Sequence, residues 1–375
     1  MFKHVLKPAA LAGLLICAIP SLASAAEVEF EGKTWTTGDF DGSEARVDEY
    51  MGRTALYLGR NFAGLQDIDL GDMVIEYDYA ATHPSGFIGV RFRDNLETGN
   101  REQFYTRPHQ SGQPDATQYM GVINGASTWQ LHAGPNEAVA TELPAQTWIK
   151  VRIVAIGDRA DIFVGDMTTP LIHVPDLRSE SETGNFSIYA SDRGGIIDTG
   201  AYISNVVVRA ATSEDEIIGS PAETAALEDG LIQSFEVSAP VKEETISATY
   251  TLADAHMPSA PWVDLGVESD GIANLARTTA IADGKNTVFV RMTLDAETAE
   301  NRMLRFGYSD RVRLFVNGEL VFFGNAQWRS RDHRFLGTIS LEDSIALHLK
   351  AGENEIIAAV SESFGGWGFK AAVQD

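Results

Sequence analysis

Short segments of alternating polar and apolar residues, separated by turn-forming residues, run through almost the whole chain. Alternation with a period of two places successive side chains on opposite faces of a β-strand. No long stretch carries the 3.6-residue period of an amphipathic helix. Strands of this length and spacing are typical of sandwiches, so we expect an all-β protein. The candidate strands include Met73–Tyr79, Phe87–Arg93, Gln103–Arg107, Trp148–Ala155, Asp161–Val164, Phe186–Ala190 and Ile203–Arg209.

Residues 211–230 interrupt this pattern with an acidic, alanine- and serine-rich stretch. Its composition favours a linker or a short helix. Strands resume beyond it, and Asn317-Gly318 is a dipeptide typical of a two-residue hairpin turn. The sequence therefore predicts two β-sandwiches, residues 26–210 and residues 231–375, joined by this acidic linker.

The first 25 residues have the features of a signal peptide that is cleaved on export. Lys3 and Lys7 precede a short apolar stretch, and residues 23–25 (Ala-Ser-Ala) form a cleavage pattern. The apolar run is too short for a comfortable bilayer span, and no later stretch approaches one. Cys17, the only cysteine, lies inside this segment, so the exported chain has no disulfide. We expect a periplasmic or secreted protein. A lipoprotein anchor on Cys17 is the alternative, disfavoured by the bulky Ile16 before it.

The chain is strongly acidic, with 53 Asp and Glu residues against 29 Lys and Arg and a formal net charge of -24. Non-specific binding of nucleic acid draws mainly on Lys and Arg at the phosphates, so the sequence argues against it. Docking on an anionic membrane surface is disfavoured for the same reason. A local basic patch for an anionic ligand remains compatible with this charge.

Strand alternation also predicts a polar face in the first sandwich. The polar side chains assigned to it are Glu76, Asp78, Arg91, Arg93, Gln103, Tyr105 and Arg107. If these strands are neighbours, one sheet face combines carboxylates, guanidinium groups, an amide and a phenol. Sugars are recognised by such planar donors and acceptors together with aromatic rings. The alternative is an ordinary solvated face with cross-strand ion pairs.

A polar loop at residues 107–119 adds candidate site residues. Loops on a rigid scaffold commonly carry binding groups, so we expect Gln118 and Trp129 to join Arg91, Arg93 and Tyr105 in binding substrate. The sequence leaves a second interpretation open, in which Tyr119 and Trp129 are core anchors and His109 caps a turn.

The first part of the chain resembles the concanavalin A-like lectin/glucanase jelly roll, in particular laminin-G-like and 3-keto-disaccharide-hydrolase-like modules. The resemblance is carried by residues 73–79, 85–93, 103–119 and 184–189 and spans about residues 27–210. It implies a two-sheet sandwich whose concave side handles carbohydrate, sometimes with calcium at the rim. Residues 310–318 and 349–356 resemble the galactose-binding-like sandwich found beside glycosidase catalytic domains, which implies a fold more than a chemistry.

Two kinds of enzyme can be tested against these residues. Jelly-roll glucanases of the resembled family carry Glu-x-Asp-x-x-Glu on one strand; here Glu76 and Asp78 begin the pattern, but Ala81 replaces the general acid. A glucanase of that type is therefore not expected. A polysaccharide lyase or keto-glycoside hydrolase would instead use Arg107 to neutralise charge, with His109 or Tyr119 moving the proton.

Residues 302–334 hold seven arginines in an otherwise acidic chain. The favoured interpretation is that they pair with carboxylates of the first sandwich or the linker, because interfaces are enriched in arginine. The alternative is a patch for anionic sugars, with Trp328 as a stacking platform and His333 beside it.

The sequence thus predicts an exported two-sandwich protein that binds a polysaccharide or another glycan. The alternatives are a lyase or keto-glycoside hydrolase working from Arg107, His109 and Tyr119, and a structural interaction module of the cell envelope. Calcium stays open as a cofactor, since the acid-rich turn at residues 67–72 is of a kind that holds it, but no metal ligand is assigned. Neither the sugar nor the oligomeric state follows from the sequence.

Overall fold

The computed structural model describes residues 26–39, 45–129, 131–132, 134–191, 200–223, 226–259, 261–327 and 339–374. These residues are organised in four sheets, and their only helices are short 3-10 turns, which confirms the expected all-β fold. The 3-10 turns are η1 (Pro108–Gln110), η2 (Glu243–Thr245), η3 (Asp254–His256) and η4 (Leu275–Arg277). The predicted signal peptide, residues 1–25, lies outside the described residues. Within the described part, no helix is both long and apolar enough to span a membrane.

Two sheets make the first sandwich. The nine-stranded sheet runs in the order β1 (Ala26–Phe30), β2 (Lys33–Asp39), β5 (Asn61–Leu65), β15 (Asn185–Ser191), β7 (Phe87–Asp94), β8 (Arg101–Thr106), β9 (Thr117–Ile123) and β10 (Ala126–Ser127), with β11 (Ala138–Val139) also paired to β9. The seven-stranded sheet runs in the order β14 (Ile172–Val174), β13 (Arg159–Val164), β12 (Ile149–Ile156), β6 (Met73–Ala81), β16 (Ala201–Ala210), β4 (Arg53–Leu58) and β3 (Arg46–Tyr50).

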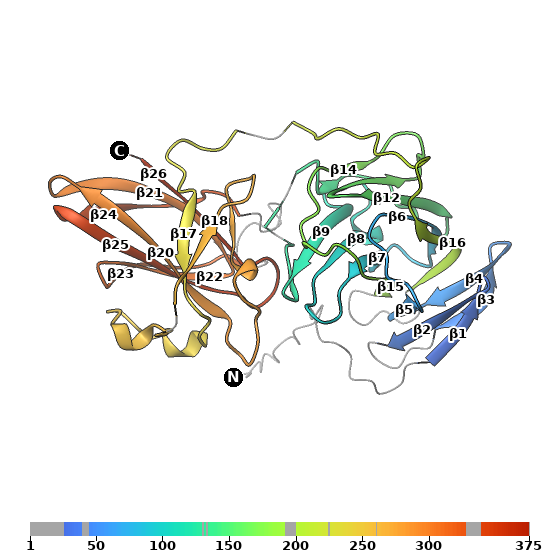
Figure 1. Ribbon diagram of the computed structural model, residues 1–375, viewed down its shortest axis with the longest axis horizontal. Helices are drawn as coiled ribbons and strands as arrows, with labels where there is room; N and C mark the ends of the chain where they lie inside the picture. The colour runs from blue at the N-terminus through green and yellow to red at the C-terminus, as the bar shows by residue number, and fades with distance from the viewer. Residues whose placement is uncertain are drawn as a thin grey trace, which may run out of the picture.

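Two further sheets make the second sandwich. The six-stranded sheet runs in the order β18 (Val263–Gly266), β17 (Ser234–Val237), β20 (Thr287–Ala296), β25 (Gly352–Ser361), β22 (Arg311–Val316) and β23 (Glu319–Asn325). The four-stranded sheet runs in the order β19 (Ala273–Asn274), β26 (Gly368–Gln374), β21 (Glu300–Ser309) and β24 (Asp343–Leu349). Figure 1 shows the two sandwiches side by side, with the chain crossing between them along one edge.

Each sandwich buries its own core between its two sheets. In the first, Val90 and Phe104 of the nine-stranded sheet pack with Ile75 and Ile153 of the seven-stranded sheet. The second has a separate core of the same kind. The predicted hairpin turn is confirmed between β22 and β23, where Asn317 and Gly318 both have a positive φ, of 49° and 85°. A two-residue turn with that backbone matches the twist of its strands.

The predicted linker follows the surface of the first sandwich in an extended form. The amides of Ile218 and Gly219 donate to the Asp161 carboxylate at 2.7 and 2.8 Å. The other oxygen of Asp161 lies 2.6 Å from Nδ1 of His173. Further along, the Ala222 amide donates to the Asn136 side chain at 2.9 Å. These contacts tie the acidic stretch to the first sandwich.

Ion pairs join the two sandwiches around one carboxylate, Glu268. It accepts from Arg178 of the first sandwich at 2.9 Å and from Arg277 of the second at 2.6 Å. His132 lies between two acids of the second sandwich, with Nε2 3.1 Å from Glu268 and Nδ1 2.6 Å from Asp270. Four ion-pair contacts among these five side chains hold the two sandwiches together.

Among the described arginines of residues 302–334, Arg311 and Arg313 bind within the second sandwich, so the interface interpretation is wrong for these two, whereas Arg305 also attracts Glu228 of the predicted linker electrostatically. Arg311 binds Glu243 through two hydrogen bonds, and Arg302 pairs with Glu300. The other two donate to backbone carbonyls, Arg305 to Leu341 and Arg313 to Thr249. All four partners belong to the second sandwich. The remaining arginines of the cluster, with Trp328 and His333, lie outside the described residues.

Candidate functional site

A hydrogen-bonded set of planar polar side chains lies on the outer face of the nine-stranded sheet, away from the core. We call this set the polar floor; it consists of Gln103, Tyr105, Arg107, Gln118 and Tyr189. The strand register sets Tyr105 of β8 directly opposite Gln118 of β9. Arg107 donates through Nη2 to the Tyr105 hydroxyl at 2.9 Å and to Gln118 Oε1 at 2.6 Å, and Tyr105 donates to the same Oε1 at 2.8 Å.

The floor continues across β7 to β15. Gln103 donates through Nε2 to the Tyr189 hydroxyl at 2.5 Å, and the Arg91 guanidinium lies 5.4 Å from the centre of the Tyr189 ring. Gly89 of β7 lies between the two tyrosines in the register. A Cβ at that position would stand 2.7 Å from Tyr105 Cβ and 2.9 Å from the Tyr189 hydroxyl, so the absent side chain makes room for both rings.

Three aromatic rings surround the Arg107 guanidinium. Its central carbon lies 5.1 Å from the ring of Tyr105, 5.7 Å from Phe87 and 5.8 Å from Trp129, which are distances at which a cation and a ring attract. Asp115 completes the shell with an ion pair. The Nε of Arg107 is buried and has no hydrogen-bond partner within the described part of the chain.

The protonation states at the floor follow from burial and charge. Burial disfavours the charged form of Arg107, but Tyr105 and Asp115 outweigh it, so the guanidinium pKa is raised above its usual value. Burial also raises the pKa of the Tyr105 phenol, partly offset by Arg107. Burial likewise raises the pKa of the Tyr189 phenol well above its usual value. Both phenols are neutral near pH 7; Tyr105 both donates and accepts a hydrogen bond, and Tyr189 accepts one from Gln103.

A half-exposed rim surrounds the buried floor. Phe87, Trp129, Arg91 and His109 are each of intermediate exposure. His109 stands on the η1 turn, where its Nδ1 lies 2.9 Å from the Gly86 carbonyl oxygen and its ring packs edge-on against Phe87, 5.2 Å between centres. The sequence-predicted residues Arg91, Tyr105, Arg107, Gln118, Trp129 and His109 are thus brought to one face.

Tyr119 is not part of this face and does not meet Arg107 and His109 there. It follows Gln118 directly in β9, and successive strand residues point to opposite sides of the sheet. Its side chain is 1% exposed within the core, where the hydroxyl donates to Glu102 at 2.6 Å. Burial, reinforced by the Glu102 charge, raises the pKa of this phenol well above its usual value. A proton-transfer set of Arg107, His109 and Tyr119 therefore does not assemble.

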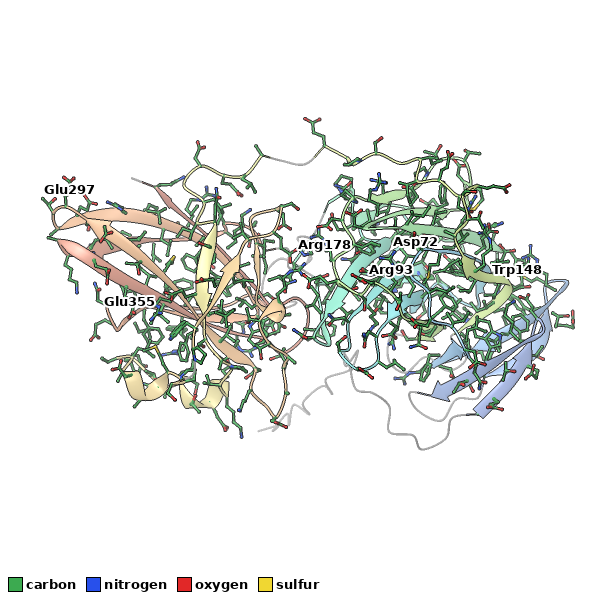
Figure 2. All side chains as sticks on the ribbon, in the orientation of Figure 1. Asp72, Arg93, Trp148, Arg178, Glu297 and Glu355 are labelled. Carbon is green, nitrogen blue, oxygen red and sulfur yellow. The ribbon has the colours of Figure 1, made fainter. Side chains whose placement is uncertain are left out.

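Arg93 also leaves the predicted face. Its φ of 46° breaks the alternation of β7, and its guanidinium Nε donates to the Gly71 carbonyl at 3.0 Å. Nη2 lies 3.5 Å from Asp72, and Figure 2 shows the two side chains together. Arg93 therefore joins the edges of the two sheets of the first sandwich.

The predicted carboxylates of β6 lie on the other sheet. Because β6 pairs with β12 and β16 and not with β7, Glu76 and Asp78 face away from the polar floor. Glu76 pairs with Lys150 at 2.7 Å, and Asp78 with Arg53 at 2.5 Å. For Glu76 the interpretation as a solvent-facing surface with ion pairs is the better one, whereas Asp78 is buried between Arg53 and Asn205.

Phe364 reaches the rim from the second sandwich. Its ring centre lies 5.2 Å from that of Trp129, and its side chain is 36% exposed. Nothing local in the sequence marks it, because the contact joins segments more than two hundred residues apart.

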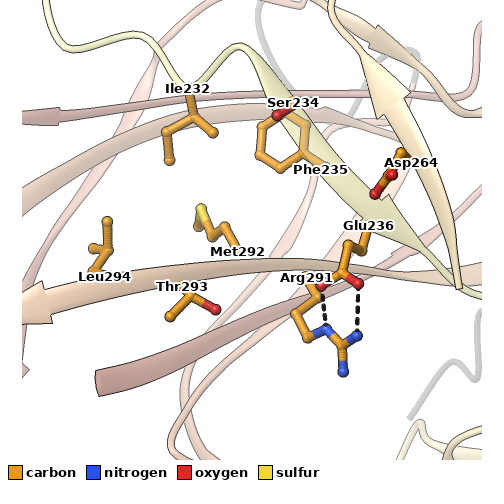
Figure 3. A pocket seen from close by; sticks show the side chains of 9 residues that line it. All are labelled: Ile232, Ser234, Phe235, Glu236, Asp264, Arg291, Met292, Thr293 and Leu294. Atoms are coloured by element: carbon orange, nitrogen blue, oxygen red, sulfur yellow. Dashed lines mark hydrogen bonds and ion pairs between the residues drawn. The ribbon is translucent and has the colours of Figure 1, made fainter. Parts of the chain in front are cut away.

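A shallow pocket with a cavity volume of about 220 Å³ lies on the second sandwich (Figure 3). Its lining residues are Ile232, Ser234, Phe235, Glu236, Asp264, Arg291, Met292, Thr293 and Leu294. The guanidinium of Arg291 already donates to both oxygens of Glu236, at 2.9 and 3.0 Å, and lies 4.2 Å from the Trp262 ring. A ligand here would have to displace these contacts, so the polar floor is the better candidate site.

The described part of the chain contains no candidate metal-binding site. No three His, Cys, Asp or Glu side chains gather closely enough there to hold an ion, and this includes the acidic turn at residues 67–72.

No protein-family model matches the chain, and no curated protein matches its sequence. Several solved structures are distantly similar. The carbohydrate binding module CBM66 from Bacillus subtilis is 15% identical, with 50% of this chain and 92% of that one covered and a TM-score of 0.32. A prokaryotic β-1,3-1,4-glucanase (lichenase) from a mouse hindgut metagenome is 9% identical, with 47% and 94% covered and a TM-score of 0.34. A family 35 carbohydrate binding module from an environmental isolate is 15% identical, with 40% and 88% covered and a TM-score of 0.22. Likeness at this level assigns no ligand, and the side chains of the floor have to supply that argument.

Proposed function

We propose that the protein binds carbohydrate on the outer face of its nine-stranded sheet. The observation that carries the proposal is the Arg107 guanidinium, which is held among three aromatic rings and hydrogen-bonded to Tyr105 and Gln118. A sugar presents hydroxyls to planar donors and acceptors and its CH faces to aromatic rings.

The half-exposed rim supports the same ligand class. Trp129 and Phe87 offer ring edges and faces next to the buried hydrogen-bonding groups, while Arg91 offers a guanidinium on the other side of Tyr189. A rigid polar floor costs little ordering on binding, because its rotamers are already held by hydrogen bonds.

The expected ligand is an uncharged glycan. Asp115 already neutralises Arg107, and the chain carries a net charge of -24 that repels polyanions at a distance. Sulfated or uronate-rich chains should therefore bind more weakly than neutral ones of the same length, and more so at low salt.

We propose binding rather than cleavage, because the residues offered for acid–base chemistry lie on opposite faces of the sheet. Arg107 and His109 face the rim, whereas Tyr119 is buried in the core.

We further propose that the chain is exported and meets its glycan outside the cytoplasm. Residues 1–25 then serve as the signal peptide, residues 26–210 and 231–375 as the two domains, and residues 211–230 as the linker.

Isothermal titration of the purified chain with a panel of soluble glycans tests the binding proposal. The panel includes glucans, fructans, xylan, galactomannan and polygalacturonate. The key variant is Trp129→Ala, and Trp148→Ala is its matched control. Trp148 also lies beside an arginine, Arg53 at 4.6 Å, and Figure 2 places it at the end of the first sandwich away from the second.

We expect Trp129→Ala to raise the Kd for the glycan about tenfold, because the variant loses one desolvated stacking contact. Trp148→Ala should leave the Kd unchanged. The absence of heat with every glycan of the panel would overturn the proposal. Equal loss in both variants would place binding elsewhere on the protein.

A further inference from the structure

We infer that the second sandwich completes the carbohydrate-binding face by contributing Phe364, and that a buried carboxylic acid–carboxylate pair, Asp310 and Glu362, holds Phe364 in place. This inference rests on the proposed function and names a further residue of the same site.

Phe364 extends the row of rings on the first sandwich. The Arg107 guanidinium lies 5.1 Å from the Tyr105 ring and 5.8 Å from the Trp129 ring, and the Phe364 ring lies 5.2 Å from that of Trp129. Two residues later the backbone touches the first sandwich. A Cβ at Gly366 would stand 2.7 Å from the Trp129 carbonyl oxygen, so only glycine allows this approach. A glycan chain lying along the row would meet both sandwiches.

The segment that carries Phe364 connects β25 to β26, and its backbone amides are hydrogen-bonded to two carboxyl groups. The Ser363 amide donates to Asp310 Oδ2 at 2.9 Å and to Glu362 Oε1 at 3.0 Å. The Phe364 amide donates to the same two oxygens, at 3.3 and 2.6 Å. Two backbone donors are thus shared by two acids, and this sets where the Phe364 side chain leaves the chain.

Asp310 and Glu362 are each 1% exposed, too buried for both to be ionised side by side. Asp310 Oδ1 is buried and accepts no hydrogen bond from the described residues. A proton on the Glu362 carboxyl group would provide the missing donor. Burial, followed by the repulsion of Asp310, raises the pKa of Glu362 well above its usual value; burial also raises that of Asp310. The pair therefore holds one proton between its two carboxyl groups.

The charged groups around the pair leave this proton in place. Arg311 Nη1 lies 3.6 Å from Asp310 Oδ2, but the same guanidinium binds Glu243 at 2.6 and 2.7 Å. One cation thus serves two anions. Among the described residues, Arg311 also attracts Glu362 electrostatically, and the neutral Ser309 hydroxyl donates to Glu362 Oε2 at 3.2 Å. When the pH rises far enough to remove the proton, two adjacent anions repel each other and loosen the grip on the Phe364 segment.

Glycan affinity measured against pH tests this inference, with the neutral glycan that binds most tightly in the panel as the probe. The variants are Phe364→Ala, Phe364→Leu and Glu362→Gln. The control is Phe323→Ala, because Phe323 is an exposed phenylalanine of β23 in the same sandwich. We expect Phe364→Ala to weaken binding about fivefold, Phe364→Leu to weaken it less, and Phe323→Ala to have no effect.

Affinity of the unaltered chain should fall as the pH rises through the titration of the pair. Glu362→Gln should remove that fall, because the amide keeps a donor toward Asp310 and cannot ionise. If Trp129→Ala weakens binding while Phe364→Ala does not, the inference is wrong and the proposed function stands. A pH profile that Glu362→Gln leaves unchanged overturns the role of the carboxyl pair. If the unaltered chain binds no glycan, both the proposed function and this inference fall.

Discussion

The Tyr119 hydroxyl donates a 2.6 Å hydrogen bond to the buried carboxylate of Glu102, inside the core of the first sandwich. The same carboxylate accepts from the amide and the hydroxyl of Ser179, at 2.9 and 2.6 Å. In turn the Tyr119 oxygen accepts from the Arg178 amide at 3.0 Å, and the Arg178 side chain reaches Glu268 of the second sandwich. A polar network therefore runs from the core of one sandwich to its interface with the other.

Tyr119→Phe should destabilise the protein without changing glycan affinity. The substitution removes a donor to a buried carboxylate and leaves the Arg178 amide without its acceptor, a loss of about 1–3 kcal/mol. Chemical denaturation measures this cost, and titration with the glycan panel checks affinity. A stable variant with lost binding would instead return Tyr119 to the site.

Gly89→Ala should disturb the polar floor. The new Cβ would clash with the Phe104 carbonyl oxygen and stand 2.7 Å from Tyr105 Cβ and 2.9 Å from the Tyr189 hydroxyl, so strand β8 and the Tyr189 side chain must shift. We expect a loss of about 1–3 kcal/mol of stability from this overpacking, together with weaker glycan binding. Gly64→Ala is the control, because Gly64 lies in the same sheet and a Cβ there would meet nothing closer than 3.8 Å. Similar behaviour of the two variants in denaturation and titration would contradict the packing argument.

Arg178→Ala should cost far more than the removal of an exposed arginine. Arg178 is buried between Glu137 at 2.7 Å and Glu268 at 2.9 Å, and its loss leaves both carboxylates without this partner. Breaking a buried pair in this way costs about 3–5 kcal/mol. Arg46→Ala removes a pair with Asp48 in which the arginine side chain is 52% exposed, and should cost less than about 1 kcal/mol. Denaturant unfolding compares the two, and equal costs would show that the interface pair is screened by water.

The interface should weaken as the pH rises, because of His132. Burial lowers the pKa of this imidazole, but its hydrogen bonds to Asp270 and Glu268 outweigh burial and raise the pKa above the usual 6.5. A raised pKa means that the folded protein holds the proton more tightly than the unfolded chain. The stabilisation is therefore complete below pH 6.5 and is lost as the pH rises through the raised value.

His132→Gln separates this effect from that of the Asp310–Glu362 pair, which also loses stability with rising pH. The difference in unfolding free energy between the unaltered chain and His132→Gln should shrink as the pH rises above 6.5 and through the raised pKa of His132. A difference that stays constant over this range would show that His132 is neutral at the interface.

Local patterns in the sequence were enough to predict the strands and the direction of side chains within them. The alternation in residues 103–107 correctly places Tyr105 and Arg107 on one face, where they are hydrogen-bonded. The Asn317-Gly318 turn is equally local, since it depends only on two residues that accept a positive φ. Applied strictly, the same alternation places the successive residues Gln118 and Tyr119 on opposite faces of the sheet.

Tertiary structure alone decided which strands became neighbours and which charges met. Glu76 left the polar face because β6 pairs in the other sheet, and Arg93 left it through one backbone torsion. The interface uses Arg178 and Arg277 rather than the arginine-rich stretch, and Phe364 meets Trp129 across the two sandwiches. The physical reason is range: a side chain's face within a strand is set by its immediate neighbours, whereas strand pairing and charge partners depend on the closure of long loops and on the packing of the whole chain.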